Sequence, residues 1–414
     1  MMDSSVVVLD DGPQGQQQQA QQQQVGVVGG AVDLAQDDIE GAPRSLHCIA
    51  TLQDGHAFAV AGNYHPVVFV CRLPVPPAAD PSDDVSVHRL YGHLAGVTAL
   101  GATGSYLASG SKDCTVKVWN PVDLTCVRSL HLHNSAISVV KWLADGYLAT
   151  ADEGGGLALW DIQDYDHPTR FDAHQRAITA IEVVSPSLFV SGDNTGKLVF
   201  WTEDGNRKRE HGACIDATAH ITGAAGVPDG IIIITAADQR LRLWSSKGDP
   251  LKDMRVSFDY SRDQRWSISH LAAGPQCSLY VGLDQFACDT EMNDQMVLRL
   301  VYDIKQGFTQ EQGFAATAAG TSDSVGRITA LAISPLDSTV LAGCEKKYAF
   351  ALDPASLSPT TPTEGPFDGN ISGITWLADK AYAAVTVQGE VFVRLPSGPK
   401  DVHLPTRTVS VVNV

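Results

Sequence analysis

The chain has 414 residues and a formal net charge of −18, from 47 acidic and 29 basic residues. This acidic balance favours solubility and opposes nonspecific attraction to nucleic acid, so direct nucleic-acid binding is not expected. The eight cysteines show no Cys-x-x-Cys spacing, and no apolar stretch approaches the roughly 20 residues of a membrane span. These features exclude a disulfide scaffold, a zinc ribbon and membrane insertion.

The first 44 residues differ in composition from the rest. Gln14 and the run from Gln16 to Gln24 are almost entirely glutamine, between the acidic pairs Asp10-Asp11 and Asp37-Asp38. Such a segment has little apolar surface to bury, so residues 1–44 are predicted to be a disordered Gln-rich N-terminal tail. The start of the chain lacks a basic, apolar targeting pattern, which predicts a cytoplasmic or nuclear protein.

Short apolar runs separated by turn residues begin after this tail. Four of them, in chain order, are Leu46–Leu52, His56–Ala61, Val67–Leu73 and Val85–Leu90. Runs of this length with apolar and polar residues in alternation are typical of half-buried strands. The first unit is therefore predicted to be a four-stranded antiparallel sheet.

The second unit shows the same order with a clearer signature. Gly92-His93 precedes a run from Val97, a second run ends near Ser109, and a third run from Thr115 ends at Trp119. Tryptophan then recurs at a period of about 40 residues, as Trp160, Trp201 and Trp244. Each of the four follows a histidine, and these histidines are His93, His133, His174 and His220.

A period of this length indicates a repeat architecture. Further units start near Ile268, Ile328 and Ile371. One small sheet cannot bury its own apolar face, whereas sheets packed radially around an axis bury one another's faces. Residues 45–414 are therefore predicted to form a single all-β propeller with eight four-stranded blades, or seven if one unit is misread. Val409–Val412 or Val25–Val28 would supply a strand that closes the ring.

Two residue pairs in these units carry a family resemblance. Gly92-His93 and Trp119-Asn120 stand where the WD-repeat β-propeller family has Gly-His and Trp-Asp, and Trp160-Asp161 gives the second pair intact. The resemblance is strong over residues 92–245 and weaker outside them. It implies a hydrogen-bonded structural tetrad within the sheet, formed here by His93, Ser109, Asp113 and Trp119.

The later units depart from this pattern at the aspartate. At the position of Asp113, the third unit has Gly154 and the fourth has Thr195. The resemblance therefore predicts incomplete tetrads in those two units. The fifth unit keeps Asp238 and Trp244 but is shortened before them.

A search for reactive groups finds no catalytic pattern. Gly154-Gly155-Gly156 lacks the following lysine and helix of a phosphate loop, and it fits a hairpin turn. The recurring histidines would each lie on a separate blade, and the acidic segment from Asp284 to Asp294 lacks the glycine and terminal glutamate of a calcium loop. We therefore expect no enzyme activity, no cofactor and no metal, and we expect this segment to be a solvated insertion or a partner contact.

One face of the predicted ring collects basic residues that are otherwise scarce in this chain. In the family, the turns between second and third strands and the connections between blades share a face. An arginine beside a tryptophan is a combination enriched at interfaces. The candidate partner-binding residues on this face are Lys112, Arg176, Arg265, Trp266, Arg327, Lys346 and Lys347.

These observations predict a noncatalytic scaffold for protein–protein interactions, a WD-repeat subunit of a larger intracellular complex. Acidic peptides or acidic loops of protein subunits would bind the basic face. The alternatives are an adaptor that recognises acidic or phosphorylated substrates, as in a ubiquitin-ligase receptor, and a propeller enzyme with a site in its central channel. The arginine that such receptors carry two residues after Trp-Asp is absent after Trp160-Asp161.

Overall fold

A computed structural model gives the arrangement of most of the chain after residue 44. Strands make up nearly all of the regular structure in this part. The residues described are 45–52, 55–73, 85–143, 146–161, 168–172, 174–185, 188–202, 207–211, 221–227, 231–236, 240–245, 249–255, 266–274, 278–285, 295–303, 307–315, 328–334, 336–345, 348–360, 365, 367, 369–395 and 398–402.

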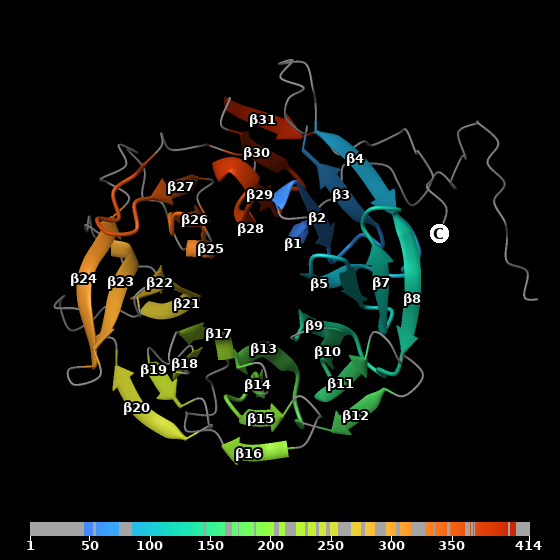
Figure 1. Ribbon diagram of the computed structural model, residues 1–414, viewed down its shortest axis with the longest axis horizontal. Helices are drawn as coiled ribbons and strands as arrows, with labels where there is room; N and C mark the ends of the chain where they lie inside the picture. The colour runs from blue at the N-terminus through green and yellow to red at the C-terminus, as the bar shows by residue number, and fades with distance from the viewer. Residues whose placement is uncertain are drawn as a thin grey trace, which may run out of the picture.

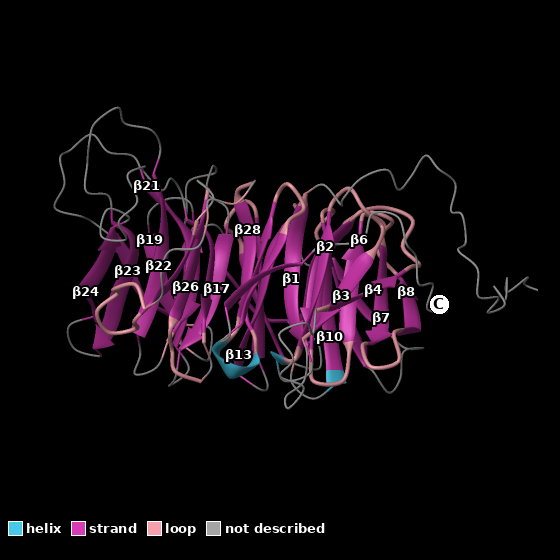
Figure 2. Ribbon diagram, turned by 90° about the horizontal axis from the view of Figure 1, so that it is seen from above, coloured by secondary structure: helices cyan, strands magenta, loops and turns pink. Residues whose placement is uncertain are grey.

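The described strands form eight sheets placed radially around a common axis (Figure 1). Seen edge-on, the ring is a disc whose strands run across its thickness (Figure 2). The first and last sheets in the chain lie side by side and close the ring (Figure 1). The all-β propeller architecture predicted from the sequence is confirmed.

The first four sheets each contain four antiparallel strands that are consecutive in the chain. Sheet 1 contains β1 (Leu46–Leu52), β2 (Ala57–Gly62), β3 (Val68–Arg72) and β4 (Ser86–Leu90). Sheet 2 contains β5 (Val97–Ala102), β6 (Leu107–Ser111), β7 (Thr115–Asn120) and β8 (Thr125–His131). Sheet 3 contains β9 (Ile137–Trp142), β10 (Tyr147–Asp152), β11 (Gly156–Asp161) and β12 (Thr169–Asp172). Sheet 4 contains β13 (Ile178–Ser185), β14 (Leu188–Asp193), β15 (Leu198–Thr202) and β16 (Arg207–His211).

The remaining four sheets continue in the same order around the ring. Sheet 5 contains β17 (Ile221–Val227), β18 (Ile231–Ala236), β19 (Arg240–Trp244) and β20 (Pro250–Arg255). Sheet 6 contains β21 (Trp266–Ala273), β22 (Ser278–Gln285), β23 (Gln295–Asp303) and β24 (Gly307–Ala315). Sheet 7 contains β25 (Ile328–Ile333), β26 (Val340–Cys344) and β27 (Ala349–Leu352). Sheet 8 contains β28 (Ile371–Trp376), a 3-10 helix (Ala378–Lys380), β29 (Tyr382–Thr386), β30 (Val391–Leu395) and β31 (Gly398–Val402).

Burial of alternate side chains holds neighbouring sheets together. In β2, Phe58 and Val60 pack against sheet 8, whereas Ala59 and Ala61 pack against sheet 2. Successive side chains of a strand point to opposite faces, so one strand contributes to the cores on both of its sides. Similar apolar clusters join sheets 2 and 3, 3 and 4, 4 and 5, 6 and 7, and 7 and 8. Because these cores are shared, each sheet depends on its neighbours.

The disc has two distinct faces, which we call upper and lower. The upper face carries the turns between second and third strands and the connections between successive sheets. Equivalent backbone hydrogen bonds tie these two kinds of loop together, for example from Lys112 N–H to Gly96 O (2.9 Å) and from Glu153 N–H to Ala136 O (2.9 Å). The lower face carries the turns between first and second strands.

The seam between sheets 8 and 1 closes the ring through side chains. The Thr51 hydroxyl lies 2.7 Å from the Thr375 hydroxyl and 2.8 Å from Trp376 O, to which it donates. Farther up the same strands, the Ser372 hydroxyl donates to Leu46 O. An apolar cluster drawn from both sheets lies behind these contacts. Each described sheet contains only its own consecutive strands, so the seam is a contact between sheets rather than a shared ladder.

The structure also qualifies several expectations from the sequence. Sheet 7 shows three strands among the described residues, with one isolated bridge from Leu352 to Pro359, whereas four strands were predicted. Asp284 belongs to β22, where it pairs with Ser267, so the acidic insertion starts later than expected. The two closing strands proposed from sequence, Val25–Val28 and Val409–Val412, lie outside the described residues. In the described part of the chain, no helix is long and apolar enough to cross a membrane.

Candidate functional site

A chain of side-chain hydrogen bonds crosses sheet 2. Trp119 Nε1–H donates to Ser109 Oγ (2.8 Å), and Ser109 Oγ lies 2.8 Å from His93 Nε2. On the other side of the imidazole ring, His93 Nδ1 lies 3.0 Å from Asp113 Oδ2. The structure therefore brings together the four residues that the family resemblance assigned to the tetrad. They join the connection before β5 to strands β6 and β7.

The protonation states follow from the surroundings of this chain. Burial, against the opposing effect of Asp113, lowers the pKa of His93. Burial alone would raise the pKa of Asp113, but the Thr115 hydroxyl and the Leu94 and Thr115 backbone N–H groups lower it to about 2. A neutral imidazole with its proton on Nδ1 donates to the carboxylate and accepts from Ser109, so every atom in the chain has a partner.

The same arrangement recurs in sheet 3, contrary to the expectation from sequence. His133 Nδ1 lies 2.7 Å from Asp152 Oδ2, and His133 Nε2 lies 2.7 Å from Thr150 Oγ1. Trp160 Nε1–H donates to the same threonine oxygen at 2.9 Å. The prediction of an incomplete tetrad, which was based on Gly154, is wrong.

Sheet 4 corrects the second expectation of this kind. His174 lies 2.8 Å from both Asp193 Oδ2 and Ser191 Oγ, and Trp201 Nε1–H donates to that serine at 2.8 Å. Thr195 occupies the position where an aspartate was sought, and its hydroxyl donates to Asp193 (2.6 Å). The fifth unit cannot be compared, because His220 and Asp238 lie outside the described residues.

The aspartate reaches its histidine from either of two positions in the turn. Asp152 and Asp193 end the second strand of their sheets, where sheet 2 has Ser111. In sheet 2 the acid stands two residues later, at Asp113, and Ser111 Oγ accepts from its backbone N–H (3.1 Å). Both positions place a carboxylate oxygen beside imidazole Nδ1, because the turn curls back over the histidine. The three sheets therefore share the contact between the carboxylate and imidazole Nδ1, whereas the sequence position of the aspartate differs.

This buried network predicts a stability that depends on pH. Burial lowers the pKa of His93 in the folded chain from 6.5, and it also lowers the pKa of His65, which lies outside this network in the turn between β2 and β3, so the unfolded chain binds protons more readily below that pH. The free energy of unfolding is therefore expected to fall as pH decreases from about 7 to about 5. The pKa values of Asp113, Asp152 and Asp193 are also lowered, so a second loss begins below 3.8.

Urea unfolding at a series of pH values measures this dependence. The variant His93→Gln removes one titrating group and is expected to show a shallower slope between about pH 7 and about pH 5. A free energy of unfolding that stays constant over this range would contradict the protonation states given above.

The upper face holds the two candidate partner-binding residues whose side chains the structure describes. Lys112 lies in the turn between β6 and β7, and Arg176 lies in the connection between sheets 3 and 4; both are exposed. Trp266 begins β21, where it pairs with Gln285. The other candidates, Arg265, Arg327, Lys346 and Lys347, lie outside the described residues.

Lys112 belongs to an exposed cluster that the sequence pattern did not reveal. Its Nζ lies 5.0 Å from the ring centroid of Tyr64, a residue 76% exposed in the turn between β2 and β3. Leu94, which is 91% exposed, follows His93 in the neighbouring connection. Gly96 lets these loops approach closely, because a Cβ there would lie 1.8 Å from Asn63 O. We call Tyr64, Leu94 and Lys112 the upper patch.

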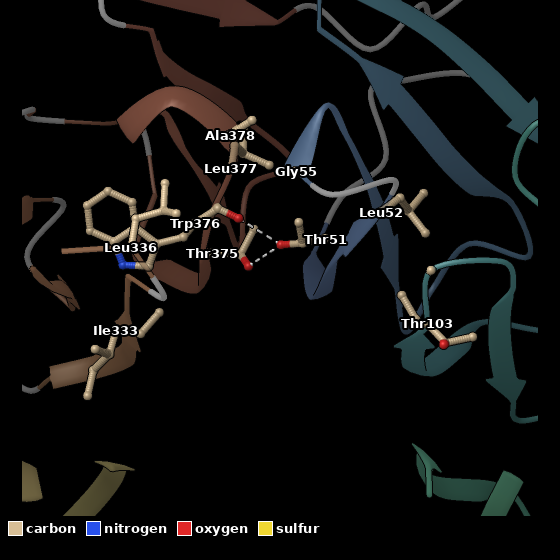
Figure 3. A pocket seen from close by; sticks show the side chains of 13 residues that line it. Thr51, Leu52, Gly55, Thr103, Ile333, Leu336, Thr375, Trp376, Leu377 and Ala378 are labelled. Carbon is tan, nitrogen blue, oxygen red and sulfur yellow. Dashed lines mark hydrogen bonds between the residues drawn. The ribbon is translucent and has the colours of Figure 1, made fainter. Parts of the chain in front are cut away.

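The lower face carries a groove of about 630 Å³ where sheets 7, 8, 1 and 2 meet. Figure 3 shows Ile333 and Leu336 on one side and Leu52 and Thr103 on the other, with the Thr51 hydroxyl between them. The walls are mainly apolar. The groove is therefore a second concave surface, on the side opposite the upper patch.

A further hollow, of about 400 Å³, lies at the centre of the ring, where the first strands of several sheets line it. Its lining includes His47, His270 and several hydroxyl side chains. Some of these hydroxyls are committed to structure, since Thr329 Oγ1 donates to Gly343 O at 3.3 Å and Ser372 Oγ donates to Leu46 O. Among the described residues, no three side chains of the His, Cys, Asp and Glu types are grouped to hold a metal.

Comparisons with known proteins agree with this geometry. Residues 84–120 match the family model for the WD domain, G-beta repeat. The ribosome biogenesis protein BOP1 homolog of Dictyostelium discoideum is 34% identical over 79 residues, which are 19% of this chain and 9% of that protein. Human striatin-3 is 38% identical over 53 residues, or 12% of this chain and 7% of that protein. The chain thus matches less than a tenth of the length of these relatives.

A solved structure is similar over a much longer stretch. The computationally designed Ika8 protein has a TM-score of 0.64 and 20% sequence identity, covering 86% of this chain and 98% of that one. At this identity the likeness concerns the fold. The chain thus has a β-propeller fold, its residues 84–120 match a WD repeat, and sheets 2 to 4 each hold a Trp–Ser/Thr–His–Asp chain.

Proposed function

We propose that the chain is a noncatalytic scaffold whose upper face binds acidic or phosphorylated segments of partner subunits. The observation that carries this proposal is the upper patch. An exposed tyrosine under a lysine ammonium, next to an almost fully exposed leucine, combines an aromatic anchor, a cation and an apolar contact. Tyrosine is enriched among the residues that dominate binding energy, and a lysine ammonium over its ring adds a cation–π contact.

The net charge of the chain indicates which charge the ligand should carry. Cations are scarce against a net charge of −18, yet Lys112 and Arg176 both lie on the upper face. An acidic segment would be repelled by most of the surface and attracted here, so charge selects the face as well as the partner. A rigid ring then holds the bound segment while other surfaces remain available for further subunits.

An array of acidic and phosphorylated synthetic peptides tests this function directly. The double variant Lys112→Glu, Arg176→Glu is expected to bind the selected peptides with an affinity lower by at least about tenfold, since each reversal replaces attraction by repulsion. The control Lys380→Glu makes one such charge reversal on the lower face, where this side chain is 74% exposed, and is compared with each single reversal on the upper face as well as with the double variant. Equal affinity of the double variant and the parent chain, or an equal loss in the control, would rule the proposal out.

A further inference from the structure

An arginine is buried at the seam between sheets 8 and 1, and two of its nitrogens have no hydrogen-bond partner among the described residues. Arg89 lies on β4 opposite Phe69, and Phe69 belongs to the apolar cluster that joins the two sheets. Arg89 is only 5% exposed, and its Cζ lies 5.8 Å from the Phe69 ring centroid. Its Nε and Nη1 atoms are buried, and the described residues offer them no hydrogen-bond acceptor.

The equivalent arginine of sheet 3 shows what is missing. Arg170 lies on β12 opposite Ala158, and Ala158 faces sheet 2 as Phe69 faces sheet 8. Arg170 Nη1 donates to the carbonyl oxygen of Leu132 at 2.8 Å. Leu132 lies in the connection from sheet 2 to sheet 3. An arginine at this position of a sheet is therefore satisfied by the connection that arrives from the preceding sheet.

The part of the chain that the structure describes contains no such connection at the seam. Sheet 1 follows sheet 8 in space, but β31 is the last described strand and β1 is the first. Among the described residues, therefore, no backbone runs from sheet 8 into sheet 1 to present a carbonyl as Leu132 does. Within the described residues, the arriving connection thus supplies an acceptor to Arg170, and nothing equivalent supplies one to Arg89.

Two further polar atoms near Arg89 are also buried without a described partner. His65 Nδ1 is one, and the His65 ring lies 6.3 Å from the same Phe69 ring. The Tyr91 hydroxyl is the other, on a side chain that packs against the apolar cluster of the seam. Burial, followed by the charge of Arg89, lowers the pKa of His65. The site thus has excess positive charge and excess donors.

We propose that Arg89, with His65 and Tyr91 beside it, forms an oxyanion-binding site that takes a carboxylate or a phosphate group of a bound partner. A buried guanidinium without a counterion is strongly unfavourable, and its planar donors match the two oxygens of either group. This site is distinct from the upper patch, because its residues face the seam and it requires neither Lys112 nor Arg176.

Thermal unfolding with inorganic phosphate or acetate, at ionic strength held constant with sodium chloride, tests the site. Either anion is expected to raise the Tm saturably, by about 2 °C at tenfold excess over its Kd. A rise in Tm with phosphate but not with acetate would indicate that the partner supplies a phosphate group. A rise with both anions would indicate that the site accepts carboxylates as well as phosphates. In Arg89→Met this response disappears, whereas in the matched control Arg170→Met it remains.

The two variants also differ without added anion. Arg170→Met loses a hydrogen bond and is expected to lower the Tm, whereas Arg89→Met removes an unpaired buried charge and is expected to leave the Tm unchanged or raise it. In the parent chain, NMR titration of His65 should show its pKa rising when anion is added, because the anion offsets the charge of Arg89. If neither anion changes the Tm or the His65 titration, or if Arg89→Met responds like the parent chain, the proposal is wrong.

Discussion

Replacing Trp119 with alanine is expected to lower the free energy of unfolding by about 3–5 kcal/mol. The indole is 1% exposed and lies in the core between sheets 1 and 2, so its removal leaves a cavity shared by both. The variant also removes the donor to Ser109. Urea unfolding of the full chain measures the loss.

A conservative variant separates packing from hydrogen bonding at this position. Trp119→Phe keeps most of the apolar volume but leaves Ser109 Oγ without its indole donor, so a smaller loss of about 1–3 kcal/mol is expected. A contribution from the hydrogen bond would be contradicted if Trp119→Phe kept full stability, and a packing role in the core would be contradicted if Trp119→Ala cost no more than Trp119→Phe.

Replacing Gly55 with alanine is expected to destabilise the chain by about 2–6 kcal/mol, through strain and a steric clash together. Gly55 has a φ of +93°, a conformation that alanine adopts poorly, and a Cβ there would lie 2.3 Å from Ala378 N. Ala378 belongs to sheet 8, so the added methyl group would push the two sheets of the seam apart.

Gly104→Ala is the matched control for this substitution. Gly104 also lies in a turn on the lower face, but a Cβ there would meet no heavy atom within 4 Å. The free energy of unfolding of Gly104→Ala is expected to stay within about 0.5 kcal/mol of that of the parent chain. Similar losses for Gly55→Ala and Gly104→Ala in urea unfolding would show that the seam is not what the methyl group disturbs.

Local patterns in the sequence were sufficient for much of the fold. The spacing of Trp119, Trp160 and Trp201 predicts the repeat, and all three indoles are buried as a radial arrangement requires. The first strands of the last two sheets begin at the predicted residues, Ile328 and Ile371. Alternation and turn chemistry act over a few residues, so they are readable without a structure.

Contacts between distant residues could not be predicted in this way. Asp152 was missed because a fixed offset from the tryptophan points to Gly154, while the turn geometry accepts an acid two residues earlier. The upper patch combines loops of two sheets, so only Lys112 of its three residues was a candidate. Arg89 was missed because what distinguishes it is the lack of a hydrogen-bond acceptor among the described residues around it, and no local sequence pattern shows this.

The seam has a consequence for the motions of the ring. Among the described residues its two sides are joined by side-chain packing and a few hydroxyl contacts, and every strand ladder ends within its own sheet. Parting the two sides would leave the ladders intact, and among the described residues no connection links the two sheets, so we expect them to separate transiently here. Each such fluctuation would uncover the guanidinium of Arg89, so this junction would also serve as the entrance for an anion.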